Sequence, residues 1–275
     1  MNTEPHPEKK PRPSRHRSTS QKTSWKGVSD WYDSLVGEKG HYYHRELIIP
    51  NVLRLLALAD GDRLLDIGCG QGVLSRHIPQ SVDYVGLDIA APLLEAARQY
   101  HPSPRHRFLH ADLTLSWPLS KHPPFSHAAC ILALQNIEKP EWVFKELSAF
   151  LCDGGRAVIV MNHPCFRIPR QSHWHVDEKT GQQRREIASY MSSQRIPIMA
   201  HPGRGGETTW TFHRPLTDYA AMAHDHGFVI EMIEEWCSPK QSTGSAARAE
   251  NRARKEFPLF MALVLRTTAN KAGRR

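Results

Sequence analysis

The chain has 275 residues, of which 40% are hydrophobic and 23% charged, and its net charge is +8. A chain of this length can bury a hydrophobic core without disulfides or a structural metal, and the composition is ordinary for a globular protein. No apolar run approaches membrane-spanning length, and the N-terminus lacks the apolar core of a signal peptide. The five cysteines form no Cys-x-x-Cys pair. We therefore expect reduced thiols, no metal site, no membrane insertion and a cytoplasmic protein.

Residues 1–24 combine prolines, serines, threonines and many basic side chains with hardly any apolar ones. Such a segment cannot bury enough surface to offset the ordering of its backbone, so we expect a disordered basic arm. The arm either attracts RNA or another polyanion, or serves as a solubilising tail. No aromatic residue is interleaved for base stacking, which favours the tail.

Residues 25–60 repeat aromatic and aliphatic side chains at helical spacing, and Pro50 interrupts or kinks the run. We expect an N-terminal helical cap. An aromatic stripe of this kind usually packs in a core. In the alternative, Tyr42 and Tyr43 face a ligand cleft.

The central motif runs from Arg63 to Gly72. An apolar run that contains Asp66 leads into three glycines at alternate positions, and Val73 and Leu74 then open a helix-like pattern. The glycines are Gly68, Gly70 and Gly72. Alternate glycines let the backbone approach a ligand and adopt positive φ angles. The motif therefore predicts a strand, a nucleotide-type binding turn and a helix, although a glycine run alone is weak evidence.

Two further acids follow strand-like segments. Asp88 lies in the apolar run 84–89, about twenty residues beyond the turn, where a carboxylate accepts hydrogen bonds from both ribose hydroxyls. Asp112 follows the short segment 107–109. Three acids at successive strand ends repel a pyrophosphate. They suit a ligand with a ribose, an adenine and a positive charge, and S-adenosylmethionine is such a ligand.

Helical patterns alternate with these strands. We expect one helix at 91–98, with a proline in its first turn, and another at 141–151, with Gly154 just past its end. Strands that alternate with helices imply a parallel sheet covered on both faces.

Two strand-like runs, 228–233 and 257–265, lie near the C-terminus and are joined without an obvious apolar helix. They suit a final antiparallel pair of strands. The helix before them is expected at 216–226, with Gly227 as its stop.

Four motifs in this order, over roughly Arg63 to Val160, resemble the class I S-adenosylmethionine-dependent methyltransferase family. The motifs are the glycine turn, 86–88, 111–113 and 131–137 followed by Pro140. The resemblance implies an α/β, Rossmann-like, doubly wound and mostly parallel seven-stranded sheet with an antiparallel last strand. This domain would span 61–268, followed by a flexible tail at 269–275.

The cofactor implied by the resemblance is S-adenosylmethionine. The contacts that it implies are Asp66, Gly68, Gly70, Gly72, Asp88, Ile89, Asp112, Leu113 and Leu134. The alternative is a Rossmann-like domain whose turn binds another nucleotide or nothing.

Residues 163–214 break the alternation with prolines, aromatics, many arginines and a Gly-Arg-Gly-Gly turn at 203–206. A long insertion with little regular structure is usually a functional lid or disordered, and the aromatics argue against disorder. The insertion begins at the carboxyl end of the fifth strand, where ligands of open α/β sheets bind. We expect an inserted acceptor lid.

Methyl transfer from a sulfonium requires alignment, exclusion of water and, for a hydroxyl, acidic carbon or ammonium, removal of a proton. His163 is the base candidate best placed by sequence, with His213 and His201 behind it. The alternative for each is a structural histidine. The candidate acceptor contacts are Tyr42, Tyr43, Gln135, Asn136 and Arg167.

The sequence Gln-Asn-Ile-Glu at 135–138 departs from the Asn/Asp-Pro-Pro-aromatic pattern of family members that methylate exocyclic or glutamine amines. It looks more like the branch that methylates small molecules. The basic lid indicates an acceptor with a carboxylate or phosphate, although solvated arginines explain the same composition.

The expected function is direct in-line methyl transfer to a small-molecule acceptor. One alternative is an RNA or protein methyltransferase that uses the arm and lid, with nucleic acid the less favoured partner. Another is an inactive S-adenosylmethionine-binding partner subunit. The sequence leaves the acceptor atom and the oligomeric state open.

Overall fold

A computed structural model describes residues 41–100, 103–199 and 208–268. The predicted arm at 1–24, the first part of the cap, His201 and the predicted tail at 269–275 lie outside these residues. Within the described residues, no helix combines the length and apolar character needed to cross a membrane.

The centre of the protein is a seven-stranded sheet with the strand order β10-β11-β5-β4-β1-β2-β3. Its strands are β1 Arg63–Ile67, β2 Asp83–Asp88, β3 His106–His110, β4 Phe125–Ile131, β5 Leu151–Asn162, β10 Phe228–Trp236 and β11 Phe260–Thr267. Strand β11 is antiparallel to both β5 and β10, whereas β3, β2, β1, β4 and β5 are mutually parallel. This order confirms the predicted Rossmann-like sheet with an antiparallel last strand.

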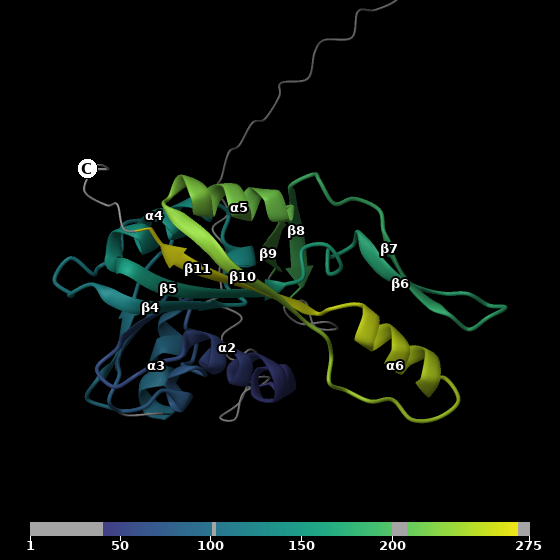
Figure 1. Cartoon of the computed structure of the whole chain (residues 1–275), viewed down its shortest axis with the longest axis horizontal. Coiled ribbons are helices and arrows are strands. Elements are labelled where there is room, and N and C mark those ends of the chain that lie inside the picture. Colours follow the sequence, from purple (N-terminus) through teal and green to yellow (C-terminus); the bar gives the residue numbers. More distant parts are fainter. Residues whose placement is uncertain (1–40, 101–102, 200–207, 269–275) are drawn as a thin grey trace, which may run out of the picture.

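Helices cover both faces of this sheet (Figure 1). Helices α4 (Glu141–Phe150) and α5 (Leu216–Asp225) lie on one face, and α2 (Ile49–Leu56) and α3 (Ala91–Tyr100) lie on the other. Neighbouring residues of β5 pack in two different hydrophobic clusters, because successive side chains of a strand point to opposite faces of the sheet. Ile159 packs in the cluster with Phe144 and Tyr219, and Val160 in the cluster with Val52 and Leu94.

Two local predictions need correction. The helix predicted after the glycine turn is only a 3₁₀ segment, η2 (Ser75–His77), because Pro79 biases Ile78 to the extended conformation in which it lies, with φ −87° and ψ 130°. Helix α4 ends at Phe150, and β5 begins at the next residue. Gly154, with φ +70°, therefore lies inside a strand rather than just past a helix.

The insertion 163–214 contains more regular structure than its composition predicts. Strands β6 (Ser172–Val176) and β7 (Gln183–Ile187) form one antiparallel pair, and β8 (Gln194–Met199) and β9 (Thr208–His213) form another. The β6–β7 pair projects from the body of the protein (Figure 1), so its side chains are largely exposed and show no apolar alternation.

Helix α6 (Ala247–Glu256) lies near the β6–β7 pair in Figure 1, whereas the cap lies on the face with α3. Helix α6 joins β10 to β11, and Ala253 is its one buried residue, so no apolar stripe revealed it. The described part of the cap consists of a π-helical turn, η1 (His44–Ile48), that continues into α2 with Pro50 in its first turn.

Candidate active site

The glycine turn follows β1 and is anchored to β2. The amides of Gly68 and Cys69 donate to the carbonyl of Leu87 at 2.8 and 3.0 Å. Gly68 has φ +72°, and a Cβ at this position would lie 2.4 Å from the Cβ of Ala133, in the loop after β4. Only glycine therefore permits this close approach of the loops after β1 and β4.

Asp88 fixes the turn to the end of β2. Its Oδ2 accepts a hydrogen bond from the Gly70 amide at 2.9 Å, and its Oδ1 accepts one from the Ala90 amide at 2.8 Å. Burial raises the pKa of Asp88, and the backbone donors oppose that rise. Each carboxylate oxygen has a second lone pair, so the two oxygens retain acceptor capacity for a pair of ribose hydroxyls. Ile89, which follows, is partly exposed.

Asp66 presents a buried carboxylate beside the turn. The Tyr84 hydroxyl donates to Oδ2 at 2.6 Å, whereas Oδ1 accepts no hydrogen bond from any described residue. Burial raises the pKa of Asp66 to about 7. An unpartnered buried carboxylate oxygen is costly unless a donor or cation meets it, so the site fits a cofactor that carries positive charge.

Tyr84 is a functional candidate that the sequence analysis missed. A Cβ on Gly86 would lie 3.0 Å from the Tyr84 hydroxyl and 2.7 Å from the Cys69 sulfur, so glycine at 86 leaves the room for this hydroxyl. No local sequence signal indicates this role, because it depends on strand register: Leu64 pairs with Tyr84, which places the tyrosine on the same sheet face as Asp66.

The third predicted acid also lies near the turn. Oδ1 of Asp112 accepts hydrogen bonds from the amide and the hydroxyl of Thr114, at 3.0 and 2.6 Å. A side-chain carbon of Leu113 lies 4.0 Å from where a Cβ on Gly68 would be. Leu134 is fully buried in the core. The cofactor roles of these residues stay predictions.

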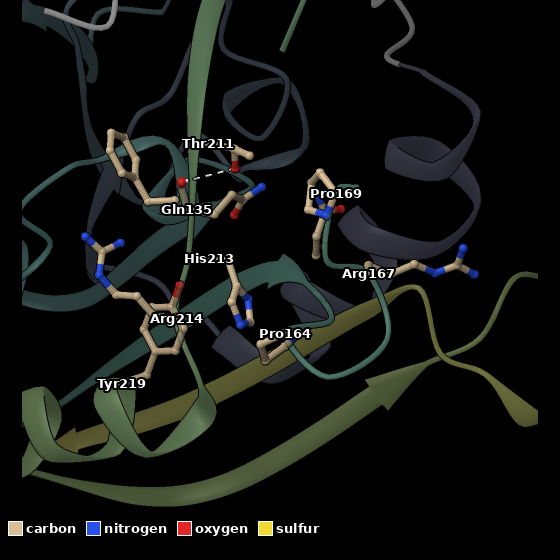
Figure 2. A pocket seen from close by; sticks show the side chains of 10 residues that line it. Gln135, Pro164, Arg167, Pro169, Thr211, His213, Arg214 and Tyr219 are labelled. Carbon is tan, nitrogen blue, oxygen red and sulfur yellow. Dashed lines mark hydrogen bonds between the residues drawn. The ribbon is translucent and has the colours of Figure 1, made fainter. Parts of the chain in front are cut away.

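A small pocket of about 30 Å³, partly open to solvent, lies at the carboxyl ends of β4 and β5 (Figure 2). Its lining includes Gln135, Asn162, Pro164, Thr211, His213 and Tyr219. The Gln135 side chain is 9% exposed, and its Oε1 accepts no hydrogen bond from the described part of the chain. A buried, unsatisfied amide oxygen on a pocket wall marks a position for a ligand donor.

His213 projects into this pocket from the end of β9 (Figure 2). Its Nε2 lies 2.6 Å from the carbonyl oxygen of Tyr190. A carbonyl can only accept, so Nε2 carries the proton and Nδ1 of the neutral ring keeps the lone pair. A base held by a second group in this way is suited to proton removal.

His163 is engaged at both ring nitrogens. Its Nε2 lies 2.6 Å from Oε1 of Glu235, and its Nδ1 accepts from the Cys165 amide at 3.2 Å. Burial lowers the pKa of His163, and the bond to Glu235 opposes that change. His163 is 2% exposed and is not among the residues that line the pocket. The geometry therefore favours His213 over His163 as the base, the reverse of the order that sequence position favours.

Of the remaining predicted acceptor contacts, Arg167 lines the pocket. The guanidinium of Arg167 extends away from Gln135 and His213 (Figure 2). Asn136 donates its amide N–H to the carbonyl of Leu132 at 3.2 Å. Tyr43 shares a hydrogen bond with Ser238 at 3.1 Å, and Tyr42 packs edge-on against Tyr43. Neither Asn136 nor the two tyrosines line the pocket, and their acceptor roles stay predictions.

Comparison with known proteins finds similarity to methyltransferases over the central part of the chain. A family profile described as "Methyltransferase domain" matches residues 65–157. An uncharacterized methyltransferase of Mycobacterium bovis is 31% identical over 117 residues, 41% of this chain and 56% of that protein. A ubiquinone biosynthesis O-methyltransferase of Xylella fastidiosa is 25% identical over 134 residues, 48% of this chain and 54% of that protein. The chain thus spans about half the length of these curated relatives.

The crystal structure of an S-adenosylmethionine-dependent methyltransferase from Mesorhizobium loti aligns with a TM-score of 0.61 and 27% identity. The alignment covers 78% of this chain and 96% of that structure. These matches agree with the strand order, the positive-φ glycine turn and the acids at the ends of β2 and β3. These comparisons support the class I S-adenosylmethionine-dependent methyltransferase family, which the motifs predicted.

Proposed function

We propose that the protein transfers a methyl group from S-adenosylmethionine to a hydroxyl of a small-molecule acceptor, by direct in-line displacement. The acceptor binds in the pocket that Gln135 and His213 line. The observation that carries this proposal is the Gln135 Oε1, which no described residue contacts by a hydrogen bond, beside an imidazole that Tyr190 orients. A pocket that supplies both a hydrogen-bond acceptor and a base suits a substrate with an ionisable O–H.

S-adenosylmethionine supplies a methyl group on a positively charged sulfur with a neutral leaving group. Asp88 would hold the ribose hydroxyls, and Asp66 would offer its free oxygen to a cationic group of the cofactor. Asp112 would contact the adenine. The turn at Gly68 keeps the backbone close enough to pack against the ligand. These residues would bind the cofactor and orient its methyl group, which is most of what such a transfer requires.

His213 takes the proton of the acceptor hydroxyl on Nδ1. The resulting imidazolium keeps its Nε2–H on the carbonyl of Tyr190, which fixes the ring and stabilises its positive charge. Gln135 orients the acceptor through its side-chain amide. The β8–β9 pair forms a wall of the pocket through Thr211 and His213 and helps to exclude water.

We also propose that the acceptor carries an anionic group and that the reaction occurs in the cytoplasm. The arginines of the insertion support the first point. The second rests on five cysteines that are all free. The O-methyltransferase named above supports oxygen as the methylated atom.

Transfer of a labelled methyl group from S-adenosylmethionine into a metabolite extract tests the proposal. We expect a labelled product of low molecular mass, identified by mass spectrometry, and loss of that product with His213→Gln. Label that enters only RNA or protein would favour the polyanion alternative. No transfer into any fraction, with S-adenosylmethionine still bound, would favour the inactive partner subunit.

A further inference from the structure

Arg167 has no anionic partner within the described chain. Its Nε is buried and makes no hydrogen bond with the residues that the structure describes, and its guanidinium lies 5.6 Å from the centre of the Trp174 ring. Burial lowers the pKa of Arg167 first, and the positive charge of Arg185 lowers it further. A half-buried guanidinium with a like charge beside it is unfavourable unless an anion binds there.

Arg185 is a fixed second cation in the same place. It donates to the carbonyl of Phe166 at 2.8 Å and to the carbonyl and hydroxyl of Ser172 at 3.2 and 2.6 Å. Its guanidinium lies 5.2 Å from the centre of the Trp174 ring. Phe257 packs edge-on against that ring at 5.4 Å. The tryptophan therefore packs against Phe257 and against two cations.

A third cation, Lys240, lies in the segment after β10 and contacts the neighbouring cap. The ammonium of Lys240 sits 5.1 Å from the centre of the Tyr43 ring, and the Tyr43 phenol is close enough to Arg167 to affect its pKa. Lys240 makes no ion pair with a residue in the described ranges. Positive charge thus converges from the insertion and from the segment after β10.

Arg167 connects this cluster to the acceptor pocket. It lines the pocket, while its guanidinium points outward from Gln135 and His213 (Figure 2). A molecule with its hydroxyl at His213 can therefore extend toward Arg167 along the pocket wall.

We infer that Arg167, Arg185 and Trp174 form a binding site for an oxyanion, a carboxylate or a phosphate, at the rim of the acceptor pocket. The site holds the anionic end of the acceptor, and in that respect it rests on the proposed function. Arg167 supplies the free fork of N–H donors, since Arg185 already donates to Phe166 and Ser172. Trp174 holds the two guanidiniums near each other through cation–π contacts.

Calorimetric titration of the full chain with benzoate and with inorganic phosphate, at low salt, tests the site. We expect saturable binding of at least one probe and at least a tenfold loss of affinity in Arg167→Gln. Arg167→Lys should lie between the two, because an ammonium keeps the charge but loses the planar fork. The matched control is Arg184→Gln, which removes the same charge from an exposed neighbour that lies 3.6 Å from Asp177. It should change affinity less than twofold. Tighter benzoate binding identifies a carboxylate, and tighter phosphate binding a phosphate.

Absence of binding for both probes, or equal losses in Arg184→Gln and Arg167→Gln, would overturn the inference. Affinity for S-adenosylmethionine, measured for every variant, verifies that each is folded and should not change. With the methylated product identified, Arg167→Gln should raise KM for its acceptor and leave kcat unchanged. If the extract yields no methylated small molecule, the proposed function fails, and the calorimetric comparison still decides the anion site.

Discussion

The hydrogen bond between Tyr84 and Asp66 gives a prediction about the pH dependence of cofactor binding. Both groups are buried, and the hydroxyl donates to the carboxylate at 2.6 Å. Tyr84→Phe removes this donor and keeps the ring in place against Phe108, 5.6 Å away between centroids. If Asp66 binds the α-ammonium of S-adenosylmethionine as a carboxylate, the variant should bind the cofactor more weakly.

The magnitude follows from the pKa of Asp66. The rise from 3.8 to about 7 on burial corresponds to about 4 kcal/mol of unfavourable ionisation. Because the pKa is raised in the folded state, this group's contribution to stability is full below about pH 4 and is lost as the pH rises through about 7. A hydrogen bond to a charged group is worth about 1.5–3 kcal/mol, so losing it should raise the pKa by at least about one pH unit.

Calorimetric titration of S-adenosylmethionine across pH is the assay. Wild-type affinity should increase as Asp66 ionises near pH 7 and decrease again as the cofactor's α-amino group loses its proton near about pH 8. With the Asp66 pKa one unit higher, the variant should lose about threefold in affinity at about pH 7.5 and about tenfold at about pH 5.5.

Tyr100→Phe is the matched control, since it also removes one phenol hydroxyl and keeps the ring, whose centre lies 4.6 Å from the guanidinium carbon of Arg76. A wild-type affinity that does not change between pH 6 and 8 would refute the role of Asp66. The same fold loss at every pH in Tyr84→Phe would show that the hydroxyl acts through packing and not through ionisation.

Three other predictions concern the base, the turn and the arm. His213→Gln should leave S-adenosylmethionine affinity unchanged and lower kcat on the order of a hundredfold. His163→Ala should mainly lower the melting temperature. A near-wild-type kcat in His213→Gln would contradict the assignment of His213 as the base. Gly68→Ala should lower the melting temperature even without cofactor, because the new Cβ would lie 2.4 Å from the Cβ of Ala133. An unchanged melting curve would show that the loop after β4 moves freely. Deletion of Met1–Ser24 should leave the melting temperature nearly unchanged, because those residues contribute no apolar core. A large decrease would show that the arm docks.

The sequence predicts the cofactor side of the site well because its signals are local. An apolar run, three alternate glycines and an acid after the next strand sit within about 25 residues of one another, and the parallel sheet then brings the strand ends together. Strand β2 and helix α3 are where the pattern indicates, since each has its own apolar periodicity.

The choice between His163 and His213 depends instead on contacts between distant residues. Glu235, which engages His163, lies 72 residues away, and Tyr190, which orients His213, lies 23 residues away. Position after the fifth strand favours His163, but it does not tell which way the ring points. The hydrogen bond between Tyr84 and Asp66 could not be predicted for the same reason, because it depends on how β1 and β2 pair.

Polar elements were hardest to predict. Helix α6 buries little more than Ala253, and the β6–β7 pair has no buried face, so neither shows an apolar period. The arginines of the insertion were visible in the sequence, but the convergence of Arg167 and Arg185 on Trp174 required the hairpin.

The most direct test of the proposed function is the distance from Nδ1 of His213 to the methyl-accepting atom, in a structure of the protein with the identified acceptor and S-adenosylhomocysteine. We expect an oxygen within hydrogen-bond reach of Nδ1, about 2.6–3.2 Å, in the pocket beside Gln135. An acceptor atom outside this pocket, or one that approaches His163 instead, would contradict the proposed function.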